Sequence, residues 1–478
     1  MSVRSMSVIR VWGAGAAVLA TAACATLPEE DAARASALAD RVATLTAETQ
    51  TLEDVAAVKR LQRAYGYYID KGFWDEAADL FAADATFETG VDGVYVGQDS
   101  IRALIVAQGG GNPGPGLPFG QYNHRMQLQP VVTIGPDGTT AQARWREFAM
   151  VGQYQDYAAW GDGVFENTYV KDDGVWSIAS FRYYPNFLAP YEGGWASLDA
   201  VSAEDAWLSD VAQDLPADRS PTETYRPFPD VYTPPFHYDA DDLGASGAGP
   251  LPPRDDAITA DELGELEALM DGYDRSLARL RSELAIENLQ AAYGYYVDKG
   301  MWTEAADLFA DDGTYEFGQS GVYVGRDRVK DGLSLMGPEG LEFGQLNNYP
   351  MLQPIISVAE DNATAKARWR SDVMLSVDGQ GRWGAGVYEN DYVNEGGVWK
   401  IASLHYYVTM WADYERGWAQ GNALPMDGPS ASNPPDQPPT EVYGALPEVY
   451  LPAYHYVHPV TGEVHPGEGV REDWSAEP

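Results

Sequence analysis

Two stretches of this sequence carry carboxyl and phenol side chains at a spacing that suits acid/base chemistry. They hold Tyr65, Tyr68 and Asp70 in one case, and Tyr293, Tyr296 and Asp298 in the other. On a helix, Tyr65 lies about 140° and Tyr68 about 160° around the axis from Asp70, so the three cannot share one narrow face. The catalytic interpretation has Asp70 orienting a base or a water while a tyrosine hydroxyl polarises a substrate oxygen. The structural alternative has the tyrosines packing in a core and Asp70 ending a helix near Gly72.

Both stretches belong to an internal duplication. Residues 65–97 and 293–325 are identical at 24 of 33 positions, at an offset of 228. The match resumes at an offset of 224 in the Ala-Arg-Trp-Arg runs that begin at Ala143 and Ala367. Each unit spans about 220 residues, far above the periods of solenoid repeats. The sequence therefore predicts two tandem domains.

Histidine can exchange protons near neutral pH, and two of the six histidines fall on predicted strands. His124, at the start of a strand, is the candidate general base of the first unit. The second unit has Asn348 at that position, which makes Asn348 a candidate for substrate binding. Conversely, His405 stands on the last predicted strand where the first unit has Arg182. For both histidines the alternative is a structural role, which is the commoner one for a lone histidine.

A four-residue run on a predicted strand offers binding groups on both of its faces. Arg144 and Arg146 share one face, while Trp145 and Glu147 share the other. If Trp145 faces the interior of the domain, its ring offers a surface on which an aromatic ligand can stack. If Arg144 and Arg146 face the interior, they can bind a phenolate or carboxylate. Surface arginines are the structural alternative, and Glu166 is either a buried acid or an interface contact. The candidate binding residues are Trp145, Arg146, Glu166, Tyr183, Asn348, Trp369 and Arg370.

The composition argues against several other classes of function. The histidines show no HExxH pattern and no close i, i+4 pairing, and His455 and His458 lie among prolines. No glycine-rich phosphate loop precedes a helix, so we expect neither metal nor organic cofactor. The single cysteine, Cys24, excludes an intrachain disulfide. With 31 Lys and Arg against 72 Asp and Glu, the net charge of −41 disfavours binding to nucleic acid or anionic headgroups, because phosphate repels such a surface.

Residues 1–24 have the pattern of an export signal. Residues 11–23 form an apolar run that is too short to span a bilayer and ends at Cys24. This resembles a bacterial lipoprotein signal, in which cleavage leaves the cysteine lipidated; Ala25 follows, where an aspartate would argue for inner-membrane retention. The alternative is a plain secretory signal cut after Ala22. We expect an exported, periplasmic protein, with a lipid anchor to the outer membrane in the first case.

Helical periodicity opens each unit, and strand-like runs follow it. Apolar residues recur at helical spacing over residues 38–61 and 266–284, and second helices are predicted at 74–81 and 302–309. The predicted strands of the first unit are 86–88, 131–134, 141–151, 163–171 and 176–184. Each unit ends in an extended strap rich in Pro and Tyr, in which His237 and His455 are expected anchors. The sequence thus predicts two α+β domains, 28–240 and 257–478, joined by a linker at 241–256.

Several of these motifs together are similar to a known family. They are the helix with Tyr65 and Asp70, the run from Trp74 to Ala82, Asp84-Ala-Thr-Phe-Glu, the Asn123-His124 strand start and Gly174-Val-Trp-Ser-Ile-Ala-Ser. Both units resemble a SnoaL-like domain of the NTF2-like superfamily, over roughly residues 50–190 and 280–412. The resemblance implies a curved antiparallel sheet wrapped by helices into a cone with one deep pocket. It also implies frequent dimerisation, here an intrachain pseudo-dimer that could associate further into a homo-oligomer.

The resemblance also implies a range of functions. The superfamily includes dehydratases, isomerases, polyketide cyclases and aromatic lyases, and also pocketed proteins without catalysis. We expect a cofactor-independent lyase or isomerase acting on a small hydroxylated aromatic or polyketide-like compound, for example a lignin-like phenolic. The candidate catalytic residues are His124, Asp70, Tyr65, Tyr68, Asp298, Tyr293 and His405. The alternative is a non-catalytic periplasmic protein that binds a ligand in its cones or serves as a scaffold.

Overall fold

The computed structural model describes residues 29–90, 92–198, 215–239, 260–419 and 428–464. The expected export signal with Cys24 and the expected linker 241–256 lie outside the described residues, and the domain bounds stay predictions. The chain forms two compact units. The smaller comprises residues 1–47 and 248–274, and the larger comprises residues 48–247 and 275–478. In the smaller unit, the described segments are helical, and Ala35 and Ala39 are buried with Leu266 packed against them.

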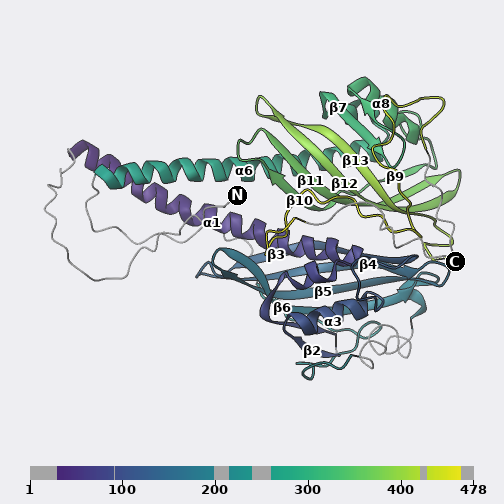
Figure 1. Ribbon diagram of the computed structural model, residues 1–478, viewed down its shortest axis with the longest axis horizontal. Helices are drawn as coiled ribbons and strands as arrows, with labels where there is room; N and C mark the ends of the chain where they lie inside the picture. The colour runs from purple at the N-terminus through teal and green to yellow at the C-terminus, as the bar shows by residue number, and fades with distance from the viewer. Residues whose placement is uncertain (1–28, 91, 199–214, 240–259, 420–427, 465–478) are drawn as a thin grey trace. The chain divides into compact units, whose positions relative to one another are not determined.

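The first half of the larger unit is a six-stranded sheet with helices against one face (Figure 1). Its strand order is β2-β1-β6-β5-β4-β3, in which β1 and β6 are parallel and the other pairs antiparallel. The helices are α1 (Glu29–Lys71), α2 (Trp74–Ala78) and α3 (Gln98–Gln108). The strands are β1 (Phe81–Thr89), β2 (Gly93–Val96), β3 (Gln121–Ile134), β4 (Thr140–Gln153), β5 (Tyr157–Asp172) and β6 (Val175–Pro190).

The second half repeats this order of elements. The helices are α6 (Ala260–Asp298), α7 (Trp302–Ala306) and α8 (Arg326–Leu333). The strands are β7 (Phe309–Phe317), β8 (Tyr323–Val324), β9 (Leu346–Asn348), β10 (Leu352–Val358), β11 (Thr364–Val377), β12 (Gln380–Glu395) and β13 (Val398–Asp413). They form one sheet in the order β10-β11-β12-β13-β7-β8, with β9 also paired to β11. The predicted α+β class and its duplication are confirmed.

The sequence patterns located the elements better than their ends. The helix predicted at 74–81 ends at Ala78, and Phe81 already pairs with Ile178 in the sheet. The strand predicted at 131–134 is the end of the much longer β3, which begins at Gln121 close to the predicted strand start at Asn123-His124. Gln129 adopts a left-handed backbone conformation where the register of β3 shifts. This bulge divides β3 into two segments.

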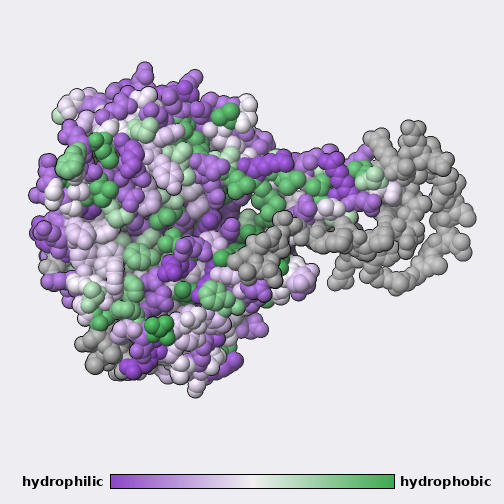
Figure 2. Space-filling view, turned by 180° about the vertical axis from the view of Figure 1, so that it is seen from behind, coloured by the Kyte–Doolittle hydropathy of each residue, from purple (hydrophilic) through white to green (hydrophobic). Residues whose placement is uncertain are grey.

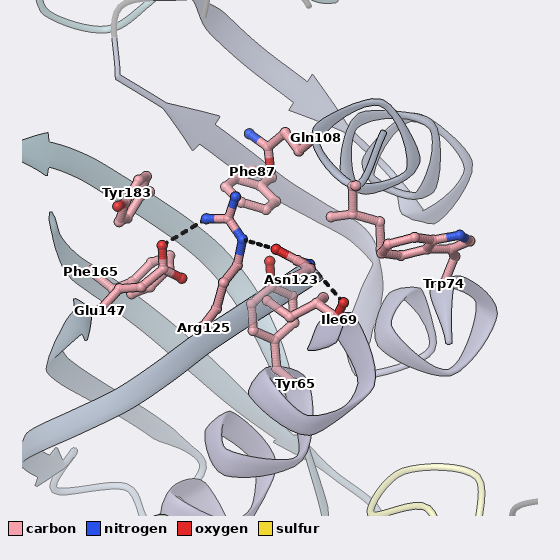
Figure 3. A pocket seen from close by; sticks show the side chains of 12 residues that line it. Tyr65, Ile69, Trp74, Phe87, Gln108, Asn123, Arg125, Glu147, Phe165 and Tyr183 are labelled. Atoms are coloured by element: carbon pink, nitrogen blue, oxygen red, sulfur yellow. Dashed lines mark hydrogen bonds and ion pairs between the residues drawn. The ribbon is translucent and has the colours of Figure 1, made fainter. Parts of the chain in front are cut away.

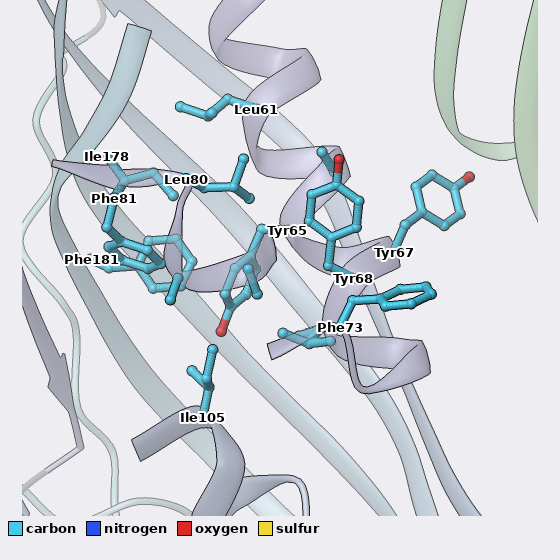
Figure 4. Packing of buried hydrophobic residues seen from close by; sticks show 14 of the residues in the cluster. Leu61, Tyr65, Tyr67, Tyr68, Phe73, Leu80, Phe81, Ile105, Ile178 and Phe181 are labelled. Carbon is cyan, nitrogen blue, oxygen red and sulfur yellow. The ribbon is translucent and has the colours of Figure 1, made fainter. Parts of the chain in front are cut away.

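Aromatic rings from the helix and the sheet fill the interior of the first half. Tyr65 on α1 packs edge-on against Phe181 of β6 with ring centroids 4.7 Å apart. Figure 4 shows Tyr65 pointing toward Ile105 beside Phe81 and Phe181, whereas Tyr67 points to the other side of the helix. The outer surface differs, because hydrophilic residues predominate on the face in Figure 2 and hydrophobic ones lie between them. No helix among the described residues is long and apolar enough to cross a membrane.

A buried polar network ties the first helix of each half to its sheet. Gln62 accepts hydrogen bonds from Tyr169 Oη at 2.8 Å and Asn167 Nδ2 at 3.1 Å, and it donates to Gln127 Oε1 at 2.7 Å. In the second half, Gln290 accepts from Tyr392 Oη at 2.8 Å and Asn390 Nδ2 at 3.1 Å. Each network satisfies polar groups that would otherwise be buried without partners.

In the described parts of the straps, residues 215–239 and 428–464, no helix or extended strand forms, and side chains of the sheets hold these segments. In the first strap, Thr222 N donates to Glu88 Oε1 at 2.8 Å, and His237 Nδ1 lies 2.9 Å from Glu166 Oε2. In the second strap the same two contacts recur at 2.9 Å between Thr440 N and Glu316 Oε1, and at 2.8 Å between His455 Nδ1 and Glu389 Oε2. The two histidines thus anchor the straps, as the sequence predicted.

Replacing the central glutamine tests whether the network holds the first helix on the sheet. We expect Gln62→Leu to lower the free energy of unfolding by about 2–3 kcal/mol, because it leaves buried donors and an acceptor without partners. The exposed Gln380→Leu is the matched control and should change it by less than about 0.5 kcal/mol. Urea unfolding followed by circular dichroism measures both. Equal effects of the two substitutions would contradict the role of the network.

Candidate functional site

The cone of the first half is almost filled by its own side chains. Its cavity has a volume of about 20 Å³, which is room for about one water. Arg125 and Glu147 cross the space as an ion pair, with Arg125 Nη1 2.9 Å from Glu147 Oε1 (Figure 3). Arg125 Nε also donates to Asn123 Oδ1 at 3.0 Å, and Asn123 Nδ2 donates to the carbonyl of Ile69 at 2.8 Å. A substrate therefore has no space in this cone.

The two charged side chains of the first cone, Arg125 and Glu147, form an ion pair with each other. Burial works to lower the pKa of Arg125, but the Glu147 carboxylate outweighs it and holds that pKa above its ordinary value. Burial, reinforced by Glu147, raises the pKa of both Tyr65 and Tyr183, which line the same cavity. Glu147 also accepts a hydrogen bond from Gln127 Nε2 at 3.2 Å. The phenols stay neutral and the carboxylate stays paired, so the first cone offers no free base.

His124 does not face the cone, which corrects the expectation from the sequence. Successive residues of β3 point to opposite faces, and Asn123 and Arg125 take the inward positions. His124 is buried on the other face, where its Nε2 atom lies 2.6 Å from Asp372 Oδ1 of the second half. Its Nδ1 atom lies 3.8 Å from Asp70 Oδ2. The two proposed partners are therefore near each other, but between the two sheets and outside the cavity.

Asp70 belongs to the same buried cluster of charges. One of its oxygens accepts a hydrogen bond from Arg125 N at 2.7 Å, and the other forms an ion pair with Arg370 of the second half. Arg370 is fully buried with its guanidinium 5.1 Å from the ring centre of Tyr67. Asp70 and Arg370, predicted to bind or act on substrate, thus join the two halves of the chain. We call Asp70, His124, Arg370 and Asp372 the interface cluster.

The cone of the second half contains a large cavity of about 900 Å³. Four of its lining positions correspond to positions around the first cavity; they are Tyr315 for Phe87, Met336 for Gln108, Asn347 for Asn123 and Tyr349 for Arg125. Glu147 of the first cone corresponds to Ser371, which is far smaller. The crossing ion pair is therefore absent from the second cone. Loss of this pair explains why one cone is filled and the other hollow.

The walls of the second cavity combine apolar and aromatic side chains with polar ones. Phe317, Val408 and Trp411 contribute apolar surface from β7 and β13, and Leu375 contributes from β11. Arg382, an exposed residue, also lines the cavity. A pocket of this size, lined by aromatic rings together with polar groups, can accommodate a small molecule.

Two tyrosines, Tyr315 and Tyr349, are among the polar residues that line this cavity. Burial raises the pKa of Tyr315 and of Tyr349, so both phenols are neutral hydrogen-bond donors at physiological pH. Asp298 Oδ1 accepts a hydrogen bond from Tyr349 N at 2.6 Å, and burial raises the pKa of Asp298. Asp298 supports the strand that carries Tyr349. The lining within the described residues includes no histidine, aspartate or glutamate.

The other candidate residues mostly serve the framework. Trp145 and Trp369 are buried core residues, and Trp369 Nε1 donates to Tyr392 Oη at 3.1 Å. Arg146 pairs with Asp162 at 2.9 Å and Glu166 pairs with Arg144, both away from the cavities.

The remaining candidates also lie outside the cavity of the second half. Tyr68 stacks on His458 of the second strap with ring centroids 5.6 Å apart. Tyr293 packs against Tyr388, and Asn348 pairs with Met374 in the sheet. His405 stacks on Tyr407 with ring centroids 3.8 Å apart, and its Nδ1 lies 3.6 Å from Glu316 Oε2.

The sequence reasoning missed the groups that decide the two cavities, namely Arg125, Glu147, Tyr315, Tyr349 and Trp411. One signal was present, because Glu147 shares a strand face with Trp145 and an inward tryptophan implies an inward glutamate. The exchange of Glu147 for Ser371 between the repeats was equally visible. The spacing of residues along the sequence carries no information on cavity volume, so it could not show that these exchanges go with a large cavity in the second cone.

Comparisons with known proteins find the same kind of domain in both halves. A family model described as a SnoaL-like domain matches residues 50–182 and again residues 278–405. A variant of Rv3472, a protein of unknown function from Mycobacterium tuberculosis, is 21% identical, with a TM-score of 0.24, covering 27% of this chain and 73% of that one. An NTF2-like protein with a cystatin-like fold from Novosphingobium aromaticivorans is 19% identical, with a TM-score of 0.24 and coverages of 28% and 84%. A hexachlorocyclohexane dehydrochlorinase, LinA Type2, is 22% identical, with a TM-score of 0.25 and coverages of 29% and 91%.

The interface cluster should matter for stability far more than the equivalent surface pair. We expect Arg370→Met to lower the free energy of unfolding by about 3–5 kcal/mol, because it leaves the Asp70 carboxylate buried without its cation. Arg146→Met is the matched control at the corresponding position, and its loss should stay below about 1 kcal/mol because that pair is partly exposed. Urea unfolding measures both variants. Losses of similar size would show that the cluster does not hold the halves together.

His405 should make the stability of the chain depend on pH. Burial lowers its pKa from 6.5 to about 4, so the unfolded state binds the proton more tightly. The free energy of unfolding should therefore fall by about 3 kcal/mol between pH 6.5 and pH 4, after the contribution of other groups is subtracted. His405→Gln should remove this part of the slope in urea unfolding at each pH. Arg182→Gln, at the corresponding position of the first half, should leave the slope unchanged, and an unchanged slope in His405→Gln would be the contradicting result.

Proposed function

Since this chain belongs to the SnoaL-like domain family through both of its halves, we propose that it binds a small aromatic molecule in the cone of its second half. The observation that carries this proposal is the contrast between the cavities, about 900 Å³ in the second cone and about 20 Å³ in the first. The larger one falls in the usual range for small-molecule pockets. The first half then serves as a framework that supports the second through the interface cluster.

The polar groups of the cavity favour a ligand with hydroxyl or carbonyl oxygens. Tyr315 and Tyr349 supply neutral donors, and Asn347 adds an amide that can both donate and accept. Trp411 and Phe317 supply ring surfaces for an aromatic ligand. Arg382, at the solvent-exposed edge of the lining, suits a carboxylate or phenolate carried by the ligand. A hydroxylated aromatic or polyketide-like compound matches this set.

Cofactor-independent lyase or isomerase chemistry on such a compound is the second candidate. It is favoured by two neutral phenols on one cavity wall, which could donate hydrogen bonds to a developing oxyanion. Asp298, with its raised pKa and its hydrogen bond from Tyr349 N, is an acid beside a lining residue on which such a mechanism could draw. We rank binding first because no acid or base lines the cavity within the described residues.

We also propose a cellular location and a type of partner for this function. The leader sequence that ends at Cys24 supports export to the periplasm with a lipid anchor at the outer membrane. The net charge of −41 supports a small-molecule ligand rather than nucleic acid or a lipid surface as partner.

Refilling the second cone tests the proposed function. The double substitution Tyr349→Arg with Ser371→Glu places the residues of the first cone at the corresponding positions of the second. We expect it to weaken binding of hydroxylated aromatics by more than about tenfold, because the cavity then contains a salt bridge. Isothermal titration calorimetry with a panel of such compounds measures the affinity, and chromatography of the mixtures detects turnover.

The control for this experiment is Tyr183→Phe, which removes a hydroxyl from the first cavity and should leave affinity unchanged within about twofold. Binding by the wild-type chain without turnover supports the binding function, and product formation supports the lyase or isomerase. Unchanged affinity after the double substitution would mean that the ligand does not enter the second cone.

A further inference from the structure

One arginine gives the second cavity a positive charge. Arg382, near the start of β12, is the one charged residue among the described residues that line this cavity. The first cone differs, because the two charged residues of its lining, Arg125 and Glu147, neutralise each other. Position 382 corresponds to Ala159 in the first half. The arginine therefore belongs only to the half that has the large cavity.

The guanidinium of Arg382 is not paired with a carboxylate of the protein. In the sheet, Arg382 stands opposite Asp413 of β13, but Asp413 Oδ2 is ion-paired with Arg416 Nη2 at 2.6 Å. Within the part of the chain that the structure describes, Arg382 forms no ion pair. Acidic residues outnumber basic ones by 72 to 31 in this chain, so the pairing does not fail for lack of carboxylates. The guanidinium can therefore take its carboxylate from a ligand.

The register of the sheet separates Arg382 from the other end of the cavity. Arg382 pairs with Asp413, whereas the lining residue Phe317 pairs with Tyr406. Asp413 and Tyr406 are seven positions apart on β13, which corresponds to roughly 20 Å along the strand. Tyr315 comes two residues before Phe317 on β7, which is parallel to β13, so it lies further in the same direction. The cavity is therefore long.

Apolar and aromatic side chains line the cavity between these two ends. Trp411 and Val408 come from the stretch of β13 that separates the ends, and Leu375 pairs with Arg382 from β11. These side chains suit the ring surfaces of an aromatic ligand.

The end of the cavity remote from Arg382 offers hydrogen-bond donors. Burial raises the pKa of Tyr315, and the nearby phenol of Tyr349 adds to this rise. Among the described residues, neither hydroxyl has a hydrogen-bond partner. Two neutral phenols close together can donate to one oxygen of a ligand.

We propose that the second cone binds an elongated aromatic carboxylate with two or more rings, its carboxylate at Arg382 and a hydroxyl or carbonyl oxygen at Tyr315. The cavity of about 900 Å³ lies near the upper limit of ordinary small-molecule pockets, so a single phenol ring would leave most of it empty. The inference rests on the proposed function and adds the charge, the length and the orientation of the ligand.

Binding of three related probes to the purified full chain tests this proposal. The probes are 4′-hydroxybiphenyl-4-carboxylate, its methyl ester and 4-hydroxybenzoate, and isothermal titration calorimetry measures each dissociation constant. We expect the biphenyl carboxylate to bind more than about tenfold tighter than its ester, which lacks the charge. We expect the same margin over 4-hydroxybenzoate, because one ring cannot contact Arg382 and the remote phenols together.

Replacing the arginine tests the origin of the preference. Arg382→Gln should reduce the preference for the biphenyl carboxylate over its ester to within about twofold and leave the affinity for the ester unchanged, because only the carboxylate needs the charge. The matched control, Arg226→Gln, removes the same charge from an exposed pair with Asp230 on the first strap and should keep the preference. Circular dichroism of each variant shows that the fold is retained.

Three results would overturn this inference while leaving the proposed function in place. They are equal binding of the biphenyl carboxylate and its ester by the wild-type chain, a preference that Arg382→Gln does not reduce, and binding of 4-hydroxybenzoate as tight as that of the biphenyl carboxylate. Failure of all three probes to bind would also overturn the inference. The proposed function itself fails only if the wider panel of hydroxylated aromatics does not bind either.

Discussion

A charge buried away from water must keep a partner, and this constraint governs both the joint between the halves and the state of the cones. Arg370 is fully buried and reaches across the joint to Asp70. Within the first cone, Arg125 and Glu147 neutralise each other and occupy the space that a ligand would need. Removing one member of such a pair costs several kcal/mol, so the arrangement persists as a unit.

Duplication let the two halves keep one fold while their interiors diverged. The polar network of Gln62 recurs around Gln290, and each strap is anchored by a histidine on a glutamate. The exchange of Glu147 for Ser371 removes the ion pair, so the second cone can be lined by apolar and aromatic side chains around neutral phenols. The first half contacts the second half through the interface cluster. The acid and the histidine considered for chemistry in the first half belong to this cluster and do not line the cavity of either cone.

More features of the fold than of the site could be predicted from the sequence. Periodicity of 3.6 and 2 residues, the turn signals and the duplication located the helices, the sheets and the straps. The bulge at Gln129 could not be located, and neither the residue type nor the predicted strand start showed which face of β3 carries His124. The contact of Asp70 with Arg370 joins residues 300 positions apart, and no local spacing encodes it. The volume of a cavity depends on many side chains together, which is why comparing Glu147 with Ser371 pointed to a difference without showing its size.

If only the second cone admits a ligand, the stoichiometry of binding measures this directly. Calorimetric titration of the purified chain with a hydroxylated aromatic that binds should give one equivalent per chain, because the ion pair of Arg125 and Glu147 closes the first cone. Two equivalents per chain, with one of them lost when the first cone is altered at Glu147, would contradict the account.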